Sequence, residues 1–479
     1  MSKCYCKALE EKTSRINTRE NEDEIRGEFQ RDRDRVLYSK SFRRLSNKTQ
    51  VFIAGFDDHM RTRLTHTLEV AQIADTIARS IGLNEVLVEA IAYGHDIGHT
   101  PFGHVGERTL NLIMNGCKDI YNFNDNLYIK EKGFKHNYQS LRVATTLENL
   151  YGEKSGLNLT RYTLWGILNH SNKIYKPCNY YGVDRKCKLQ NTNFECHIDG
   201  EFVIDFYDDS ILEDKRDWTI EAAVVAVADE IAQRHHDVED GIYAGILDKN
   251  ELIDKFKKAF NDLLSQEENK MIEKLKELSM DNKSKIIAYL SKLIVNFYTG
   301  QYISNLKGLL SEIKRKFDIH SSDEFYTNKE EVYNYLARKS RNGNIMKYLE
   351  FEESFDKRDG EFKKYLYNNI LYSELAQSMD GKADYIIRQL FKAYLSNPQQ
   401  LPDKTITTIC HNFIGVDGIE SFDGEERSFL KQKLDSPDEG KKMQKIVLRV
   451  TCDFIAGMTD HYAMNQFEKL YGAQQFKNY

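Results

Sequence analysis

The chain has 479 residues, 41% of them hydrophobic, which is enough for two or three average domains or for one large helical body. Only 5 prolines and 27 glycines leave long uninterrupted segments, which favours helices over a turn-rich β architecture. The formal net charge of −6 argues against a protein that coats nucleic acid.

The N-terminal 20 residues lack the apolar segment of a signal peptide, and no stretch approaches the roughly 18–20 apolar residues of a membrane span. The 8 cysteines are scattered and do not resemble a secreted disulfide scaffold. We therefore expect a cytoplasmic protein with no membrane partner.

Four regions are expected in chain order. Residues 1–28 are a polar lead-in, which we expect to be mobile or loosely docked. Residues 29–250 form a helical core, interrupted by an irregular or small β insertion at about 172–218. Residues 251–380 are expected as a peripheral helical region, in which Lys- and Glu-rich amphipathic segments as far as residue 355 are expected as solvated helices around the outside. Residues 381–479 are expected as helices that pack on the core.

The insertion carries three cysteines and a histidine: Cys178, Cys187, Cys196 and His197. Structural zinc sites favour cysteine pairs separated by two to four residues, and these cysteines are separated by about eight. Free thiols are therefore favoured over a zinc site.

Two predicted helices each present a histidine near an apolar stripe. Apolar residues recur at helical spacing over residues 63–81, and Gly82 predicts the end of that helix. His66 lies one turn from the first members of its stripe. The next helix has Asn84 as its predicted N-cap, and His95 stands on its apolar face where a core residue is expected.

A third predicted helix begins near Thr219 and is almost entirely Ala and Val around Asp229. A lone carboxylate in such surroundings is costly unless it is neutralised or binds a cation. A metal ion bound by residues of all three helices would remove that cost, and the candidate ligands are His66, His95, Asp96 and Asp229. Mixed imidazole and carboxylate ligands suit Mn²⁺, Fe²⁺, Zn²⁺, Ni²⁺ or, less well, Mg²⁺.

A simpler interpretation competes with the metal site. A single histidine on an apolar helix face is usually a hydrogen-bonded core residue, and an adjacent His-Asp pair occurs by chance in many sequences. The joint pattern favours the metal site: an upstream His, then His-Asp, then a distant Asp inside an apolar helix.

That pattern resembles the HD-domain phosphohydrolases, and neighbouring segments narrow the resemblance to the deoxyguanosine triphosphate triphosphohydrolase family, which includes broader deoxynucleotide triphosphohydrolases. Six segments carry it: FRRLSNKTQVF, HDIGHTPFGHVGE, FKHNYQSLRV, WGILNHS, ADEIAQRHHDVEDGI and CDFIAGMTDHYA. They fall within residues 29–245 and 383–465, in the family's order.

The resemblance implies an all-α fold around an HD-domain core. It implies metal-dependent cleavage of a deoxynucleoside triphosphate, dGTP first, to the deoxynucleoside and inorganic triphosphate. The expected cofactor is a divalent ion, Mn²⁺ or Mg²⁺, with Fe²⁺, Ni²⁺ or Zn²⁺ as alternatives. It also implies a homo-oligomer, either hexamer or tetramer, and single-stranded DNA or a nucleotide as a candidate effector.

The resemblance assigns catalytic roles within the segment YGHDIGHTPFGHVGE. His104 matches the family's catalytic histidine, and Glu107 matches its acidic partner. Residues i and i+3 of a helix are neighbours, so Glu107 can orient His104. The pair would protonate the 5′ oxygen or manage the attacking water. Without the resemblance, an ordinary solvated helix pair is the favoured interpretation.

Further positions match family residues that contact the substrate. His99 and His136 would line the α-phosphate, and Arg63 would contact phosphate. Gln50 would bind the sugar 3′ hydroxyl, and Asp237 would serve the same end of the sugar.

Arg43, Arg44 and Lys48 belong to a basic block with interleaved aromatic residues. They could hold the β- and γ-phosphates, because arginine and lysine suit phosphate oxygens. An ordinary solvated basic face is an equal alternative for each of them.

Gln233 departs from the family. Many relatives carry a tyrosine at this position, four residues after the last metal ligand, where it blocks a 2′ hydroxyl. Exclusion of ribonucleotides must then depend on another residue or be weaker, and the preference among dNTPs stays open.

Two other functions compete with dNTP hydrolysis. An HD enzyme acting on another nucleotide phosphoester, a monophosphatase or phosphodiesterase, shares the ligand pattern but does not need His104, Glu107 and the C-terminal segment together. A non-catalytic nucleotide sensor or DNA-binding regulator would be favoured by loss of a ligand or of the acid–base pair, and none is missing from the sequence.

Overall fold

The computed structural model describes residues 4–17, 25–50, 61–116, 132–149, 156–173, 175, 203–340, 343–415 and 424–472. These residues fold into α-helices with short 3₁₀ turns and contain no β-strand, only isolated bridges such as Arg15–Thr160. The predicted all-α class is confirmed. Within the described ranges, none of the helices combines the length and hydrophobicity that crossing a bilayer demands.

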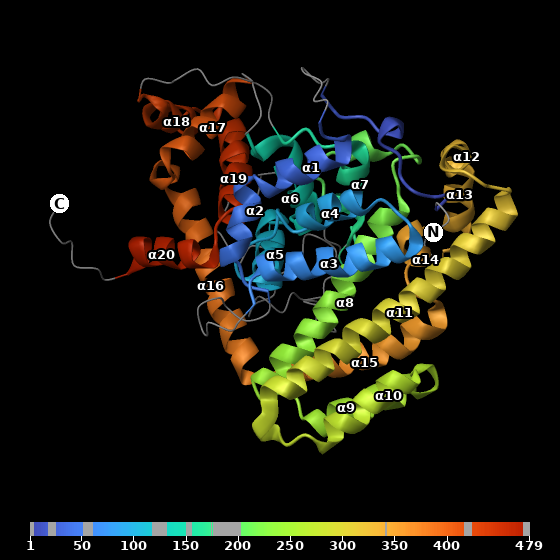
Figure 1. Ribbon diagram of the computed structural model, residues 1–479. Coiled ribbons are helices and arrows are strands. Elements are labelled where there is room, and N and C mark those ends of the chain that lie inside the picture. The colour runs from blue at the N-terminus through green and yellow to red at the C-terminus, as the bar shows by residue number, and fades with distance from the viewer. Residues whose placement is uncertain are drawn as a thin grey trace, which may run out of the picture.

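The helices fall into three successive groups along the chain (Figure 1). The first group is α1 (Glu28–Leu37), α2 (Lys40–Arg44), α3 (Arg63–Ile81), α4 (Glu85–Gly94), α5 (Gly103–Met114), α6 (His136–Arg142), α7 (Arg161–Asn169) and α8 (Ile220–Tyr243). The second is α9 (Lys249–Phe260), α10 (Gln266–Glu277), α11 (Lys283–Phe317), α12 (Ser322–Thr327), α13 (Lys329–Lys339), α14 (Ile345–Leu349) and α15 (Glu353–Leu371). The third is α16 (Glu374–Ser396), α17 (Asp403–Ile414), α18 (Glu426–Leu434), α19 (Gly440–Ala456) and α20 (Asp460–Tyr471).

Helices α3, α4 and α8 begin and end where capping chemistry predicts. Thr62, Asn84 and Thr219 each accept a hydrogen bond from a backbone N–H in the first turn of the helix that follows. Gly82 ends α3 in the left-handed conformation, with a φ of 88°. These caps fix the rotation of the helices that carry the predicted metal ligands.

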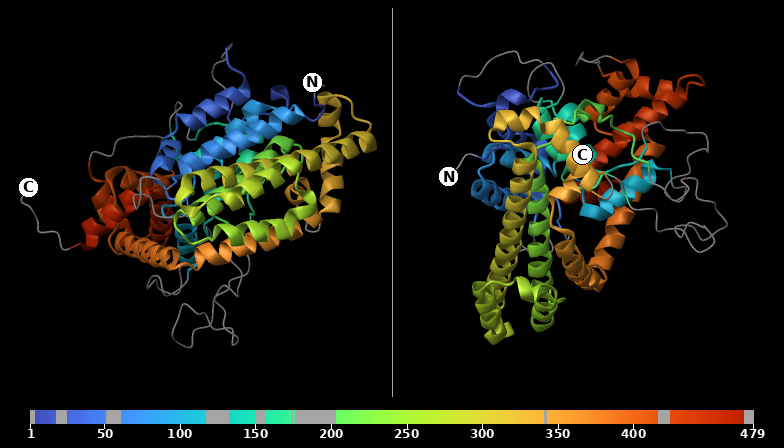
Figure 2. Two further views of the ribbon diagram at one scale, coloured as in Figure 1. Left: turned by 60° about the horizontal axis from the view of Figure 1, so that its bottom comes forward. Right: turned by 90° about the vertical axis from the view of Figure 1, so that its right-hand side faces the viewer.

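Helix α8 is the central element of the larger hydrophobic core. Its Ala- and Val-rich sides pack against α3, α4 and α7, and α11 covers another side (Figures 1 and 2). Helix α11, in the region 251–380 that is expected to be peripheral, buries its apolar stripe, including Leu290, Phe297 and Tyr302, in this core. The physical reason is that α8 is apolar nearly all round and must be covered on more than one side.

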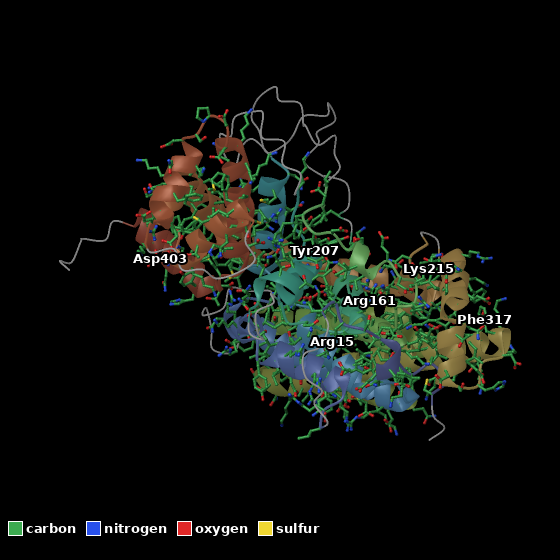
Figure 3. The ribbon with its side chains drawn as sticks, turned by 90° about the horizontal axis from the view of Figure 1, so that it is seen from above. Arg15, Arg161, Tyr207, Lys215, Phe317 and Asp403 are labelled. Carbon is green, nitrogen blue, oxygen red and sulfur yellow. The ribbon has the colours of Figure 1, made fainter. Side chains whose placement is uncertain are left out.

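A second hydrophobic core lies between α5 and the C-terminal helices. Phe102, Val105 and Leu110 pack with buried residues of α16, α17 and α19. Seen from above, the C-terminal helices near Asp403 and the end of α11 near Phe317 lie at opposite ends of the molecule (Figure 3). Helix α5, which begins with the last residues of the segment HDIGHTPFGHVGE, therefore packs against the C-terminal helices.

Residues 4–17 of the N-terminal lead-in are docked on the helical core, which differs from the expectation of loose docking. Tyr5 and Cys6 are buried in the larger core, and Arg15 forms an ion pair of 2.7 Å with Asp32 of α1. The predicted insertion at 172–218 lies largely outside the described residues, as do Cys178, Cys187, Cys196 and His197. Its described part at 203–218 contains only a short 3₁₀ turn, Ser210–Leu212.

Candidate active site

Three helices bring the four predicted metal ligands together. His66 lies in the first turn of α3, His95 and Asp96 follow the last residue of α4, and Asp229 lies midway along α8. Nε2 of His66 is 2.9 Å from Oδ1 of Asp229, and Nε2 of His95 is 3.9 Å from the same oxygen. Nε2 of His95 is 3.6 Å from Oδ2 of Asp96. Residues separated by more than 160 positions in the chain thus converge on one point.

One buried nitrogen at this point lacks the partner that its burial requires among the described residues. Nδ1 of His95 is 2.6 Å from the carbonyl oxygen of Ala92, so this nitrogen carries the hydrogen in a neutral ring. Nε2 of His95 is then a buried lone pair, and it has no hydrogen-bond partner among the described residues. It faces two carboxylates, so a positive charge is needed between them. A divalent cation suits the group of His66, His95 and Asp96, whose ligand atoms lie within 4.8 Å of one another, and Asp229 lies beside the two imidazoles.

Arg63 adjoins the same cluster. One terminal nitrogen of its guanidinium donates to Oδ2 of Asp96. Its Nε and its other terminal nitrogen are buried, and neither has an acceptor within the described part of the chain. Burial opposes ionisation of Asp96, but the basic groups around it, including the Arg63 guanidinium, outweigh it and hold its pKa well below the ordinary value. Arg63 therefore has donors available for an anion next to the candidate metal centre.

A sharp turn returns the chain to this cluster at the start of α5. Phe102 and Gly103 both have left-handed backbone, with φ of 61° and 60°. The next residue, His104, has a side chain that is 66% exposed, and its Nδ1 is 3.5 Å from Oε2 of Glu107. The i, i+3 contact predicted from the sequence is therefore present, although it is long for a hydrogen bond.

Glu107 is buried and has a nearer imidazole than His104. Its Oε2 is 3.2 Å from Nδ1 of His136, and the backbone N–H of His136 donates to its other oxygen. Burial opposes its ionisation, but the charge of His136 and hydrogen bonds from His104 and His136 hold its pKa well below the ordinary value. One carboxylate therefore serves two histidines.

The ring of His99 contacts the rings of both His136 and His104. Its ring stacks on that of His136 at a centroid distance of 4.6 Å and meets that of His104 edge-on at 5.5 Å. Burial first, and the charge of Arg63 second, lower its pKa well below the ordinary value, so His99 is neutral. Its buried Nδ1 has no partner among the residues described.

Gln50 and Asp237, the two residues predicted to bind the sugar, are both at least partly buried. The buried amide oxygen of Gln50 has no described partner, and the backbone of Gln50 lies beside Gly103. Asp237, on α8, is only partly exposed, and burial together with the charge of Asp240 raises its pKa to about 7. Each side chain therefore has a polar group that could form a hydrogen bond with a bound ligand.

The predicted phosphate-binding block is held differently from the expectation. Lys48 is buried, and its Nζ donates to the carbonyl oxygens of His99 and Ala456, the latter at 2.9 Å. Arg44 donates to the carbonyl oxygen of Gly457 at 2.8 Å. Arg43 is exposed. The block thus ties the site to the segment CDFIAGMTDHYA, and Lys48 and Arg44 already have backbone partners.

The same C-terminal segment contributes a buried carboxylate, that of Asp460, which holds two loops together. Asp460 accepts hydrogen bonds from the backbone N–H of Thr49 and of Phe102, both at 2.8 Å. It thereby holds the chain before Gln50 against the turn that starts α5. The motif CDFIAGMTDHYA does not by itself indicate this role for Asp460.

Comparison with known proteins agrees with this arrangement. The chain matches the HD domain over residues 63–234 and the phosphohydrolase-associated domain over residues 349–412 and 425–469. A deoxyguanosinetriphosphate triphosphohydrolase-like protein of Geobacter sulfurreducens is 31% identical over 445 residues, which cover 92% of this chain and 88% of the relative. Proteins of the same description from Brucella ovis and Bartonella tribocorum are 32% and 30% identical, covering 94% and 92% of this chain and 91% and 89% of theirs. The chain belongs to the deoxyguanosinetriphosphate triphosphohydrolase-like family.

Membership in the family confirms the resemblance seen in the six motifs and makes the protein an HD-domain phosphohydrolase. Gln233, the position at which the sequence departs from many relatives, lies one turn after Asp229 on α8 and is partly buried. An amide side chain therefore stands one helical turn from the candidate metal ligand Asp229.

Two features of this family member were missed in the sequence. His170 follows α7, and its Nε2 lies 3.1 Å from Nε2 of His136. Nδ1 of His236 lies 3.3 Å from Nδ1 of His66, and its other nitrogen contacts Glu69. The contacts of His236 could have been predicted from helical spacing. Glu69 is three residues after His66, and His236 is seven residues after Asp229, so each lies on the same helix face as a predicted metal ligand. No local spacing in the sequence predicts the contact between His136 and His170.

Proposed function

We propose that the protein hydrolyses deoxynucleoside triphosphates, dGTP first, to the deoxynucleoside and inorganic triphosphate, with a divalent cation, Mn²⁺ or Mg²⁺, as cofactor. The observation that carries the proposal is the convergence of four imidazole and carboxylate ligand atoms from α3, α4 and α8. The names and extent of similarity of the relatives support the substrate class.

The reaction breaks the bond between the α-phosphorus and the 5′ oxygen. A cation bound by His66, His95, Asp96 and Asp229 would polarise an α-phosphate oxygen and lower the pKa of bound water. Arg63 would bind a phosphate oxygen through the two guanidinium nitrogens that have no described acceptor. His99, neutral and buried, would donate a hydrogen bond to the same phosphate without adding charge.

His104 would transfer the proton, either to the 5′ oxygen of the leaving deoxynucleoside or from the attacking water. Its exposure lets it reach the substrate and exchange protons with solvent. The ionised Glu107 would stabilise the imidazolium, because an opposite charge favours the protonated ring. Gln50 and Asp237 are proposed for the sugar, with Asp237 as the acceptor of a hydroxyl hydrogen when it is ionised.

Product analysis tests the proposal. The protein is incubated with each dNTP and Mn²⁺, and the products are separated by anion exchange. We expect inorganic triphosphate in equal amount with the deoxynucleoside, with dGTP turned over fastest. Release of pyrophosphate or orthophosphate would instead favour an HD phosphohydrolase acting on another nucleotide phosphoester. Equal release from GTP would show that Gln233 does not exclude a 2′ hydroxyl.

A further inference from the structure

One nitrogen of His66 faces away from the four-ligand site, which is formed by His66, His95, Asp96 and Asp229. Nε2 of His66 lies 2.9 Å from Oδ1 of Asp229, whereas its Nδ1 lies 3.3 Å from Nδ1 of His236. The side chain of His236 is fully buried, and its ring meets that of His66 edge-on at a centroid distance of 5.2 Å. Helix α8 therefore contacts both nitrogens of His66, through residues about two helical turns apart.

Glu69 completes a chain of contacts behind His66. Its carboxylate contacts Nε2 of His236. Glu69 lies on α3, one turn after His66, so α3 supplies both ends of the chain and α8 supplies the middle. Burial opposes ionisation of Glu69, but hydrogen bonds from His235 and His236 hold its pKa below the ordinary value. An ionised carboxylate only accepts hydrogen bonds, so Nε2 of His236 is the donor in this contact.

The two ends of the chain decide where the ring hydrogens lie. With its hydrogen on Nε2, a neutral His236 ring has a lone pair on Nδ1. A His66 ring that binds a cation through Nε2 carries its own hydrogen on Nδ1, which faces that lone pair. Each donor then meets an acceptor. A charged His236 would instead place a second hydrogen against that of His66.

A cation bound by the outer residues themselves is a competing explanation. Ligand atoms of Glu69, His235 and His236 lie within 4.8 Å of one another, as they would around an ion. However, Nε of Arg61 lies 3.5 Å from Oε1 of Glu69, and a terminal nitrogen of Arg61 contacts Glu239. The guanidinium already supplies positive charge to this cluster and would repel a metal ion. The geometry therefore favours a chain of hydrogen bonds over an outer metal site.

We propose that Glu69 and His236 are positioning residues for the candidate metal centre, because together they fix the hydrogen of His66 on Nδ1 and aim its Nε2 at the cation. The inference rests on the four-ligand site of the proposed function. Groups outside a ligand set commonly orient metal-bound histidines and raise their basicity. Here the carboxylate acts through a second histidine, so a ligand in the first turn of α3 depends on a residue of α8.

Manganese binding without substrate tests the inference. The full chain is stripped with a chelator, and Mn²⁺ binding is followed by electron paramagnetic resonance of the free ion. The binding that Asp229→Ala lacks defines the four-ligand site. His236→Phe keeps a ring and removes both hydrogen bonds, so this site should bind Mn²⁺ about 10–100-fold more weakly. His236→Asn should recover part of the affinity, because its side-chain oxygen can replace Nδ1 as the acceptor for His66.

The glutamate at the end of the chain provides a second, matched comparison. Glu69→Ala should weaken Mn²⁺ binding about tenfold. Glu239→Ala removes a carboxylate from the same cluster, but Glu239 contacts His235 and Arg61 rather than His236, so this variant should keep the wild-type affinity. Circular dichroism checks that each variant is folded, and the glutamate pair decides the matter if the His236 variants are not.

Three results would overturn the inference and leave the four-ligand site in place. The first is wild-type affinity in a folded His236→Phe or in Glu69→Ala. The second is equal weakening in His236→Phe and His236→Asn, which would assign His236 a packing role alone. The third is equal weakening in Glu69→Ala and Glu239→Ala, which would indicate a general effect of charge. A wild-type chain that binds no Mn²⁺ would contradict the four-ligand site itself, and the positioning roles with it.

Discussion

His104 and Glu107 differ in exposure, and the difference fits a proton-transfer pair. The imidazole is 66% exposed, whereas the carboxylate is buried and has several donors around it. A buried ionised carboxylate can hold an exposed ring in place without competing with it for substrate. The contact between the two is long, as is common at sites that tighten only around a bound substrate.

Replacing the imidazole of His104 tests whether this residue transfers the proton. His104→Gln should lower kcat by about 10²–10⁴, the usual contribution of a positioned acid or base, and leave the metal content unchanged. His320→Gln is the control, because His320 is similarly exposed, at 64%, and lies far along the chain. Steady-state kinetics and metal analysis of both variants provide the comparison. Full activity in His104→Gln would contradict the assigned role.

Asp237 predicts a pH dependence of stability. Its pKa is raised from about 3.9 in an unfolded chain to about 7 in the folded protein, mainly by burial. Between these values the folded state binds the extra proton, so the contribution of Asp237 to the free energy of unfolding is present at low pH and lost as the pH rises to about 7. Asp237→Asn should remove this loss. Denaturant unfolding from pH 5 to 8 should show the variant gaining on the wild type as pH rises, and parallel curves would contradict the shift.

At the scale of single elements, Gly98 sets how closely α6 approaches the segment HDIGHTPFGHVGE. A Cβ at this position would lie 2.1 Å from the backbone nitrogen of Ser140. The backbone N–H of Gly98 donates to the hydroxyl of Ser140, which in turn donates to the carbonyl oxygen of His95. The position of His136 at the start of α6 therefore depends on this glycine.

Gly98→Ala should destabilise the fold by about 1–3 kcal/mol, the usual cost of overpacking, and reduce kcat by displacing His136. Gly308→Ala in α11 is a matched control, because nothing lies within 4 Å of its added Cβ. It should stabilise the protein by about 0.5–1 kcal/mol through helix propensity. Chemical denaturation gives both values. A neutral Gly98→Ala would mean that α6 is not fixed by this contact.

The elements also show what the sequence could predict and what it could not. Helices α3, α4 and α8 follow from apolar spacing and from their caps, so three of the four ligand positions could be placed on the right faces. The burial of α11 could not be predicted, because amphipathic spacing identifies an apolar stripe but not the surface that it covers. The His136–His170 pair depends on how α6 and α7 pack, which no local pattern records.

For the whole molecule, the candidate metal centre links helices that are far apart in the chain. An ion that binds only the folded state stabilises it by about 2.7 kcal/mol at 100 times its dissociation constant. Adding Mn²⁺ to the metal-free protein should therefore raise Tm in a concentration-dependent manner. Asp229→Ala should lose most of this shift, measured by scanning calorimetry. An equal shift in the variant would place the stabilising ion elsewhere.

The most direct test of the central claim is hydrolysis of dGTP in ¹⁸O-labelled water, followed by phosphorus NMR. Attack of water at the α-phosphorus predicts inorganic triphosphate with one ¹⁸O per turnover and an unlabelled deoxynucleoside. The activity should disappear after chelation and return with Mn²⁺. Label in the deoxynucleoside, release of pyrophosphate or orthophosphate, or turnover that survives complete removal of metal would contradict the account.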